Sequence, residues 1–280
     1  MPVEIPSDYH VRVLADSVAF GVRLTTLQAR FPRFILAEVN THRALSRSSA
    51  SSRAIPVEKR IAAVRADPFI PHAFGKNQRG MQSEAALGLD EQLLARQAWL
   101  AAASMACDQA SLLAGLSVHK QWASRLLEPF LWHEAIISAT DWSNFFHLRI
   151  NPQAQPEFQF AARAMKAAMD ASTPTELGVG DWHLPLVDER DTDLDLPTRI
   201  QLSVARCARV SYLTHDGRRD VPADLALYEK LKSSGHCSPF EHPATVVGAH
   251  GFNHGNFRYP WLQARKLIPN EADILSGDIS

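Results

Sequence analysis

The Ser/Arg-rich stretch at residues 40–56, NTHRALSRSSASSRAIP, constrains this chain more than any other feature. It places three cations, Arg43, Arg47 and Arg53, close to His42. The serines between them are Ser46, Ser48, Ser49, Ser51 and Ser52. Serine is a compact hydrogen-bond donor and arginine is a fixed, always-charged fork, so the combination suits an anion such as a phosphate or diphosphate. A disordered linker has a similar composition. The run, however, follows directly on the apolar segment FPRFILAEV and ends in AIP, so we expect an ordered anion site.

The composition indicates a globular protein. The chain has 280 residues, of which 46% are hydrophobic and 21% are charged, and its length permits one large domain or two ordinary ones. A net charge of −1 gives no global attraction to nucleic acid, so any anion binding must be local. The three cysteines are widely spaced and have no metal-ligand spacing, which favours a reduced, cytoplasmic setting. We expect no membrane segment, because no apolar run reaches the length of a membrane span.

Hydrophobic patterning predicts strands and then a helix before the Ser/Arg run. Residues 9–30 are rich in β-branched and apolar residues near alternation, which is typical of strands. Residues 33–45 (RFILAEVNTHRAL) follow Pro32 and predict a helix with His42 and Arg43 near its C-terminus. The Ser/Arg run is then expected to be a loop.

The middle of the chain is predicted to be mostly helical. The expected helices span residues 57–65, 84–116, 118–139 with an interruption near Pro129, and 155–169. Residues 71–82 are irregular and rich in amide and basic side chains, which indicates a surface loop or a lid over a polar ligand.

The C-terminal third begins with a change of composition. Residues 173–197 are rich in proline, glycine and acidic residues, which predicts a connector. Beyond it we expect a helix at 224–233 and a basic, aromatic tail of helical period, GNFRYPWLQARKLIP. We therefore predict a single domain over 1–280, made of a first part at 1–172, the connector at 173–197 and a last part at 198–280.

Three separated segments resemble the flavin-dependent thymidylate synthases. The first is THRALSRSSASSR at 41–53, which is similar to the family signature R-H-R-x-x-S-x-N-E-x-S-x-R. The residues that match are His42, Arg43, Ser46, Ser51 and Arg53, whereas Thr41, Ser48 and Ser49 replace Arg, Asn and Glu. The second segment includes SRLLEP around Arg125, which resembles A-R-x-x-L-P. It continues in DWSNFFHLRINPQAQPEF, which resembles N-F-x-x-L-R…A-Q-x-E with Asn144, Arg149 and Glu157 in register.

The third segment is out of order. ARVSY, closed by Ser211 and Tyr212, and GHCSPFEH, closed by His242, resemble a segment that precedes the R-H-R motif in the family. The resemblance therefore implies a circularly permuted member, which is tolerable where the original termini lie close in space.

The resemblance implies a fold, a reaction and a set of site residues. The fold is α/β (α+β), with a twisted, mostly antiparallel sheet and a helical subdomain. The reaction converts dUMP to dTMP with methylenetetrahydrofolate, FAD and NADPH, in a homotetramer with shared active sites. His42, Arg43, Asn144 and His242 would bind the cofactor. Arg53, Arg125 and Arg149 would be catalytic and, with Ser49 and Ser51, would hold the nucleotide.

Other interpretations stay open at this point. The departures at Thr41, Ser48 and Ser49 are compatible with another pyrimidine nucleotide, with hydroxymethylation, or with an inactive nucleotide- or RNA-binding homologue. Arg265 or Lys266 in the tail could replace the cation lost at Thr41. Taken alone, Arg125 and Arg149 would be read as surface ion-pairing residues. The histidines 236, 242, 250 and 254 are clustered, but no acid or cysteine completes a convincing metal site, so we predict none.

Overall fold

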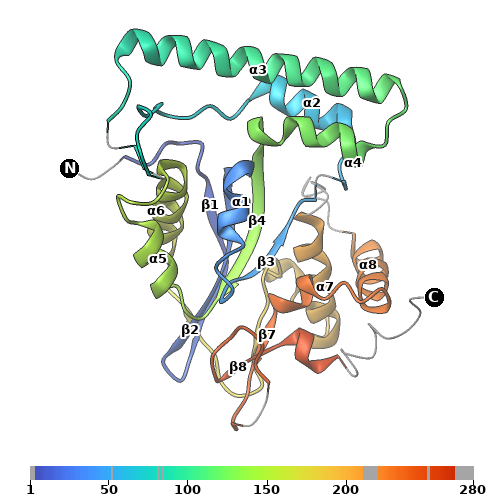
Figure 1. Cartoon of the computed structure of the whole chain (residues 1–280). Coiled ribbons are helices and arrows are strands. Elements are labelled where there is room, and N and C mark those ends of the chain that lie inside the picture. Colours follow the sequence, from blue (N-terminus) through green and yellow to red (C-terminus); the bar gives the residue numbers. More distant parts are fainter. Residues whose placement is uncertain are drawn as a thin grey trace.

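A twisted, mostly antiparallel sheet forms the centre of the protein (Figure 1). The computed structural model describes residues 4–51, 53–80, 82–83, 85–210, 220–250 and 253–268. Within these residues the main sheet has the strand order β3-β4-β2-β1-β5. Its strands are β1 (Val11–Ala19), β2 (Val22–Pro32), β3 (Ser46–Ser49), β4 (Trp132–Ala139) and β5 (Thr175–Glu176). Neighbouring strands pair antiparallel except β1 and β5, which are parallel.

A tight hairpin joins β1 to β2. Phe20 and Gly21 both have positive φ, 46° and 75°, which is the backbone conformation of a two-residue type I′ turn. This turn sets the register in which Ala19 faces Val22. Both faces of β2 are buried, because Leu24 belongs to one apolar core and Leu27 to another.

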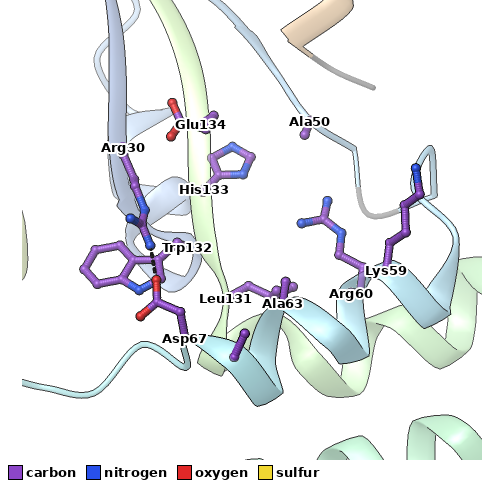
Figure 2. Close-up of a pocket in the computed structure, with 11 residues that line it drawn as sticks. Arg30, Ala50, Lys59, Arg60, Ala63, Asp67, Leu131, Trp132, His133 and Glu134 are labelled. Carbon is purple, nitrogen blue, oxygen red and sulfur yellow. Dashed lines mark hydrogen bonds and ion pairs between the residues drawn. The ribbon is translucent and has the colours of Figure 1, made fainter. Parts of the chain in front are cut away.

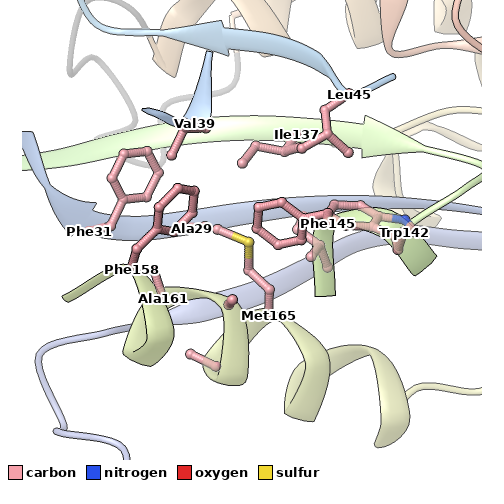
Figure 3. Packing of buried hydrophobic residues seen from close by; sticks show 14 of the residues in the cluster. Ala29, Phe31, Val39, Leu45, Ile137, Trp142, Phe145, Phe158, Ala161 and Met165 are labelled. Carbon is pink, nitrogen blue, oxygen red and sulfur yellow. The ribbon is translucent and has the colours of Figure 1, made fainter. Parts of the chain in front are cut away.

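Two helices cover one face of the sheet. They are α5 (Ser143–Arg149) and α6 (Pro156–Asp170), and α6 follows a loop that places Pro156 in its first turn. Buried side chains of α6 such as Phe158 and Met165 pack on Ala29 of β2 and Ile137 of β4, as Figure 3 shows. This is the largest apolar core of the molecule among the described residues.

The opposite face is covered by the C-terminal part of the chain. A small antiparallel sheet, β6 (Trp182–His183), β7 (Ala244–Val246) and β8 (Trp261–Gln263), packs there together with α7 (Leu196–Arg209). α8 (Val221–Ser233) packs on α7. Asp224 of α8 pairs with Arg206 and Arg209 of α7, at 3.1 and 2.6 Å, and Arg206 also contacts Asp191 of the preceding 3₁₀ turn, Glu189–Asp191, at 2.6 Å.

A helical subdomain lies at one end of the sheet, at the top of Figure 1. It consists of α2 (Val57–Ala66), the long α3 (Leu89–Gly115), α4 (Lys120–Ala123) and a 3₁₀ helix η2 (Ser124–Phe130). Ile61, Cys107 and Leu127 belong to its separate apolar core. None of the described helices combines the length and the apolar character that crossing a membrane requires.

The predicted fold class is confirmed: the fold is α/β (α+β), with a mostly antiparallel sheet and a helical subdomain. The early strands and the helices predicted at 57–65, 155–169 and 224–233 are also present. The helix predicted over 33–45 is short: after a 3₁₀ turn, α1 (Leu36–Val39) ends before His42.

Three local predictions are wrong. The helix expected over 118–139 ends at Phe130, and residues 132–139 form β4 instead, because pairing with both β2 and β3 satisfies the backbone of this strand. The Ser/Arg run is not only a loop, since Ser46–Ser49 form β3. The tail expected to be helical forms β8 and a 3₁₀ turn, Ala264–Leu267. Residues 173–197 contribute β5 and β6 to the two sheets, while the division of the chain at this segment stays a prediction.

Candidate functional site

His42 follows the end of α1 in a turn that two backbone contacts fix. Nη1 of Arg47 donates to the carbonyl oxygen of His42 at 2.6 Å and to that of Val39 at 3.2 Å. These bonds add to the backbone hydrogen bonds of the turn, in which the carbonyls of Val39 and His42 accept from the N–H groups of His42 and Leu45. This local arrangement holds the His42 ring against the end of α5.

A cavity of about 300 Å³ lies beside His42, and we call it the His42 pocket. Two segments far apart in the sequence line it: the turn after α1 and helix α5. Its residues are Thr41, His42, Arg43, Ala44, Leu45, Asp141, Asn144, Phe145, Leu148 and Arg149. The structure therefore brings together four of the predicted site residues, His42, Arg43, Asn144 and Arg149.

The imidazole of His42 is a hydrogen-bond acceptor in this pocket. Nε of Arg149 donates to Nε2 of His42 at 2.8 Å, which assigns the remaining proton of the neutral ring to Nδ1. Burial, together with the charges of Arg149 and Arg47, lowers the pKa of His42 to about 4. The ring packs edge-to-face on Phe145 at 5.0 Å, so His42 is a neutral, oriented group at neutral pH.

Arg149 is held from two sides. Besides its bond to His42, its guanidinium lies over the Phe158 ring, 4.4 Å from the centroid. Burial lowers the pKa of Arg149 from its ordinary value, but the group stays charged at neutral pH. The pocket thus contains a partly buried positive charge next to a neutral imidazole.

Two further polar side chains of the pocket are available to a ligand. Arg43 and Asn144 are exposed, and neither has a hydrogen-bond or ion-pair partner within the part of the chain that the structure describes. Asp141 is engaged differently, because it accepts hydrogen bonds from Ser143 and pairs with Arg258. The free donors at the pocket mouth are therefore cationic and amide groups, which suit an anionic or heteroaromatic ligand.

The other residues predicted to hold the nucleotide lie elsewhere in the protomer. Arg53 and Ser51 are exposed in the loop after β3, where Oγ of Ser51 accepts from the backbone N–H of Arg53 at 3.3 Å. Arg125 forms an exposed ion pair with Glu128 at 2.8 Å. Ser49 is in β3, opposite Ala135. None of these four is among the described residues that line the His42 pocket.

Ser46 and Ser48 of the predicted anion run face the interior. Side chains alternate along a strand, so these two point inward while Arg47 and Ser49 point the other way. Oγ of Ser46 accepts from Nε2 of Gln263 at 2.9 Å, and Oγ of Ser48 bonds Nε2 of His242 at 2.9 Å. Both serines therefore anchor the C-terminal segment to the sheet.

His242 belongs to a buried row of polar groups that crosses the main sheet. Its ring bonds Ser48 on β3 and Ser138 on β4, at 2.9 and 2.8 Å. Ser138 bonds Thr26 of β2 at 2.6 Å, and His183 then joins Thr26 to Ser17 of β1, at 2.8 and 2.9 Å. Burial lowers the pKa of His183 and of His242 to about 3. His242 lies outside the His42 pocket, and its role toward a cofactor stays a prediction.

Sequence reasoning missed a second cationic pocket, between α2 and the start of β4. This cavity of about 230 Å³ is lined by Arg30, Lys59, Arg60, Asp67, His133 and Glu134 among others, and we call it the Arg60 pocket (Figure 2). The sequence offers one signal for it, the pair Lys59–Arg60 on a helix directly after the Ser/Arg run. The pairing of β4 that completes the pocket was not predicted.

A third cavity, of about 770 Å³, lies under the loop that was predicted as a lid or a surface loop. The loop contributes Pro71, Phe74 and Ser83, and the start of α6 contributes Pro156 and Glu157. Burial raises the pKa of Glu157 above its ordinary value. The loop is irregular, as predicted, and a β-bridge between Gly75 and Ala86, with backbone hydrogen bonds from Lys76 to Ala85 and from Leu87 to Phe74, joins it to the residues before α3.

The remaining predictions concern metals, the cations of the tail and three residues of the Ser/Arg run and the motifs. No group of three or more His, Cys, Asp or Glu side chains that could hold a metal occurs among the residues described. Arg265 pairs with Glu241, and neither Arg265 nor Lys266 is among the described residues that line the His42 pocket, so their replacement of the cation absent at Thr41 stays a prediction. Arg149 and Arg47 are the charges that act on His42. Ser52, Ser211 and Tyr212 lie outside the described residues.

Comparisons with known proteins give no family. No protein-family model and no curated protein matches the chain. Two solved structures of the UMP/dUMP methylase PolB from Streptomyces cacaoi are similar to it. The structure bound with 5-Br UMP has a TM-score of 0.49 at 16% identity, over 60% of this chain and 91% of that chain. The structure bound with 5-Br dUMP has a TM-score of 0.44 at 16% identity, over 52% and 65%. Both TM-scores lie below 0.5, so these similarities do not establish a function for the chain.

Proposed function

We propose that the chain is a flavin-dependent pyrimidine nucleotide methyltransferase that converts dUMP to dTMP, with FAD as cofactor and methylenetetrahydrofolate and NADPH as cosubstrates. One observation carries the proposal: two motif segments about a hundred residues apart meet in one pocket. His42 and Arg43 come from the first segment, and Asn144 and Arg149 come from the second, with His42 and Arg149 in direct contact.

The residues of the His42 pocket fit part of a flavin. Arg43 and Asn144 offer free donors, and Arg149 supplies a fixed charge beside a neutral imidazole. Bound FAD would supply the hydride chemistry, while the protein positions and polarises the reactants. A cavity of about 300 Å³ is at the lower end of the range for ligand pockets, so it accommodates only one portion of a dinucleotide.

The rest of the ligand would then contact a neighbouring subunit. Arg53 and Arg125, the other residues proposed to hold the nucleotide, lie outside the His42 pocket of their own protomer and are exposed. A site assembled from two copies would let the cations of one protomer meet the His42 pocket of another. Positive charge near the pyrimidine would stabilise negative charge that develops on the ring.

A solvent-facing apolar stripe on α3 supports such an assembly. Leu94, Met105 and Leu112 are 64, 64 and 55% exposed, and the opposite side of the helix packs on the subdomain core. A helix that is apolar on both sides is typical of an interface. We propose a homotetramer, and its mass in solution tests this part independently of activity.

The motif departures favour a second candidate reaction. Ser48 is committed to His242 inside the fold, and Ser49 supplies a hydroxyl where the family signature has a carboxylate. Loss of that carboxylate changes the contacts available to the nucleotide, so modification of another pyrimidine nucleotide, such as hydroxymethylation, is the alternative. A flavin-free nucleotide- or RNA-binding protein is the remaining class.

The test starts from the purified chain. We expect flavin absorbance and, after incubation with dUMP, methylenetetrahydrofolate and NADPH, a methyl group added to dUMP in the mass spectrum. Arg149→Ala should lose bound flavin, whereas Lys166→Ala, which removes an exposed ion pair on α6, should retain it. If FAD is bound but no dTMP forms, the alternative reaction on another pyrimidine nucleotide is favoured. Absence of flavin under all conditions would contradict both enzyme readings.

A further inference from the structure

We propose that the Arg60 pocket binds a phosphate group, held by the guanidinium of Arg60 and the ammonium of Lys59. The inference is independent of the proposed function, because no residue of the Arg60 pocket lines the His42 pocket, and only Ala50, at an unmatched position, comes from the motif segments. Figure 2 shows both side chains projecting from α2 on the side of the pocket that Ala50 and His133 close.

Arg60 is the observation that points to a ligand. Its side chain is 4% exposed, and its Nε has no hydrogen-bond partner. Within the described part of the chain, no carboxylate forms an ion pair with it. Buried arginines in proteins are normally paired, since an unpaired buried charge is costly. Burial and the nearby charge of Arg33 lower the pKa of Arg60 to about 10, and the carboxylate of Glu128 offsets only part of this effect.

The groups around Arg60 add positive charge. Arg33 is 13% exposed at its side chain, and its Nη1 donates to the carbonyl oxygen of Ala50 and to Nδ1 of His133, each at 3.1 Å. The nearby carboxylate of Glu128 is shared between Arg33 and Arg125, at 3.4 and 2.8 Å. An anion in the pocket would therefore be attracted by more than one cation.

The two carboxylates of the pocket are engaged at its other end. Asp67 pairs with Arg30, whose guanidinium lies 4.5 Å from the centroid of the Trp132 ring. Glu134 accepts from Nε2 of Gln28 at 3.2 Å. Because Glu134 follows His133 on β4, the two side chains leave opposite faces of the strand, and Figure 2 shows the carboxylate of Glu134 away from Arg60. The Arg60 end of the cavity stays positive.

The dimensions favour a compact anion. A volume of about 230 Å³ is below the range that holds drug-sized ligands, so the pocket suits a phosphate group rather than a whole cofactor. Arginine binds phosphate with two parallel hydrogen bonds, and lysine adds a point charge. A phosphate bound here would supply the partner that Nε of Arg60 lacks.

Calorimetric titration with inorganic phosphate, at an ionic strength held constant with chloride, tests the proposal. We expect saturable binding that weakens at least about tenfold in Arg60→Gln and less in Lys59→Gln. Arg65→Gln is the matched control, because Arg65 lies on the same helix, is exposed and pairs with Asp108 outside the pocket. Lys59 is exposed, so Lys59→Gln keeps the test available if Arg60→Gln fails to fold.

Further titrations identify the source of the phosphate and separate this site from the His42 pocket. If Arg60→Gln weakens the affinities for UMP and for inorganic phosphate equally, and uridine does not bind, the site is assigned to phosphate monoesters. Binding of inorganic phosphate alone would assign it to the free ion. Arg149→Ala should leave phosphate affinity unchanged, whether or not flavin binding fails. Absence of saturable binding, or equal affinities in the wild type and in the Arg60 and Lys59 variants, would overturn the proposal, as would a loss confined to Arg149→Ala.

Discussion

Arg149 donates from Nε to Nε2 of His42 across 2.8 Å, although the two residues are 107 positions apart in the sequence. The bond orients the imidazole and fixes its tautomer, and it also explains why protonation of His42 is disfavoured, because a proton on Nε2 would face the guanidinium. The contact joins the turn after α1 to the end of α5 and gives the pocket between them a defined shape.

Removal of Arg149 should raise the pKa of His42. Arg149→Ala eliminates a nearby positive charge and the donor to Nε2, while burial of the ring remains. We expect the pKa of His42 to move up from about 4 toward its ordinary value, as measured by NMR titration of the imidazole signals. An unchanged pKa in Arg149→Ala, with the fold intact, would show that burial and Arg47 set it without Arg149.

Stability should fall with acid between about pH 6.5 and pH 4. His42 has a folded-state pKa of about 4 and an ordinary value of 6.5, so the unfolded chain binds a proton in this range that the folded chain does not. Its contribution to the free energy of unfolding is therefore complete above pH 6.5 and is lost as the pH falls. His183 and His242 act in the same direction. Urea unfolding across this range should show a shallower pH dependence in His42→Gln than in the wild type.

Ser138 should matter to stability because it connects the two halves of the polar row, Thr26 with His183 on one side and His242 on the other. Its hydroxyl bonds both Thr26 and His242 and is fully buried. Ser138→Ala leaves these groups without that partner, at a cost of about 1–3 kcal/mol in the free energy of unfolding. Ser233→Ala is the control, since Ser233 is exposed, and it should change stability by less than about 0.5 kcal/mol. Equal values for the two variants in urea titrations would argue against a structural role for the polar row.

The buried ion cluster that joins α7 to α8 should be sensitive to loss of Arg206. Arg206 is 7% exposed at its side chain and contacts two buried carboxylates, Asp191 and Asp224. Arg206→Met leaves both acids with less compensation, and we expect a loss of about 3–5 kcal/mol in the free energy of unfolding. Arg190→Met, which removes the exposed pair with Asp188, should have no measurable effect. A small loss in Arg206→Met would mean that Arg209 alone compensates Asp224.

The fold was predictable where periodicity was unambiguous. The hairpin β1–β2 is rich in β-branched and apolar residues near alternation, and α6 has an apolar side of helical spacing, so both were predicted correctly. β4 was taken for a helix because WHEAIISA is apolar on both faces, and periodicity does not separate a fully buried strand from a buried helix. β3 was missed because the Ser/Arg composition resembles a loop, whereas pairing with β4 determines its conformation.

The candidate site was predictable to the extent that the motifs marked it. The motifs predicted His42, Arg43 and Asn144 as cofactor-binding residues and Arg149 as a catalytic residue, and these four residues line one pocket. His242, predicted beside the first three, does not line it. The motifs did not predict that Arg53 and Arg125 lie outside this pocket, because their exposed positions depend on how the loop after β3 and the helical subdomain pack. Arg60 was not singled out, because its burial arises only when α2 packs beside β4.

The polar row across the main sheet has a consequence for synthesis of the chain. Thr26 and Ser138 receive their histidine partners from residues 183 and 242, which leave the ribosome long after the strands that need them. Ser46 likewise waits for Gln263. The central strands therefore reach full hydrogen bonding only when almost the whole chain has been translated, and we expect a nascent chain that ends before residue 242 to be held in a protease-sensitive, incompletely folded state.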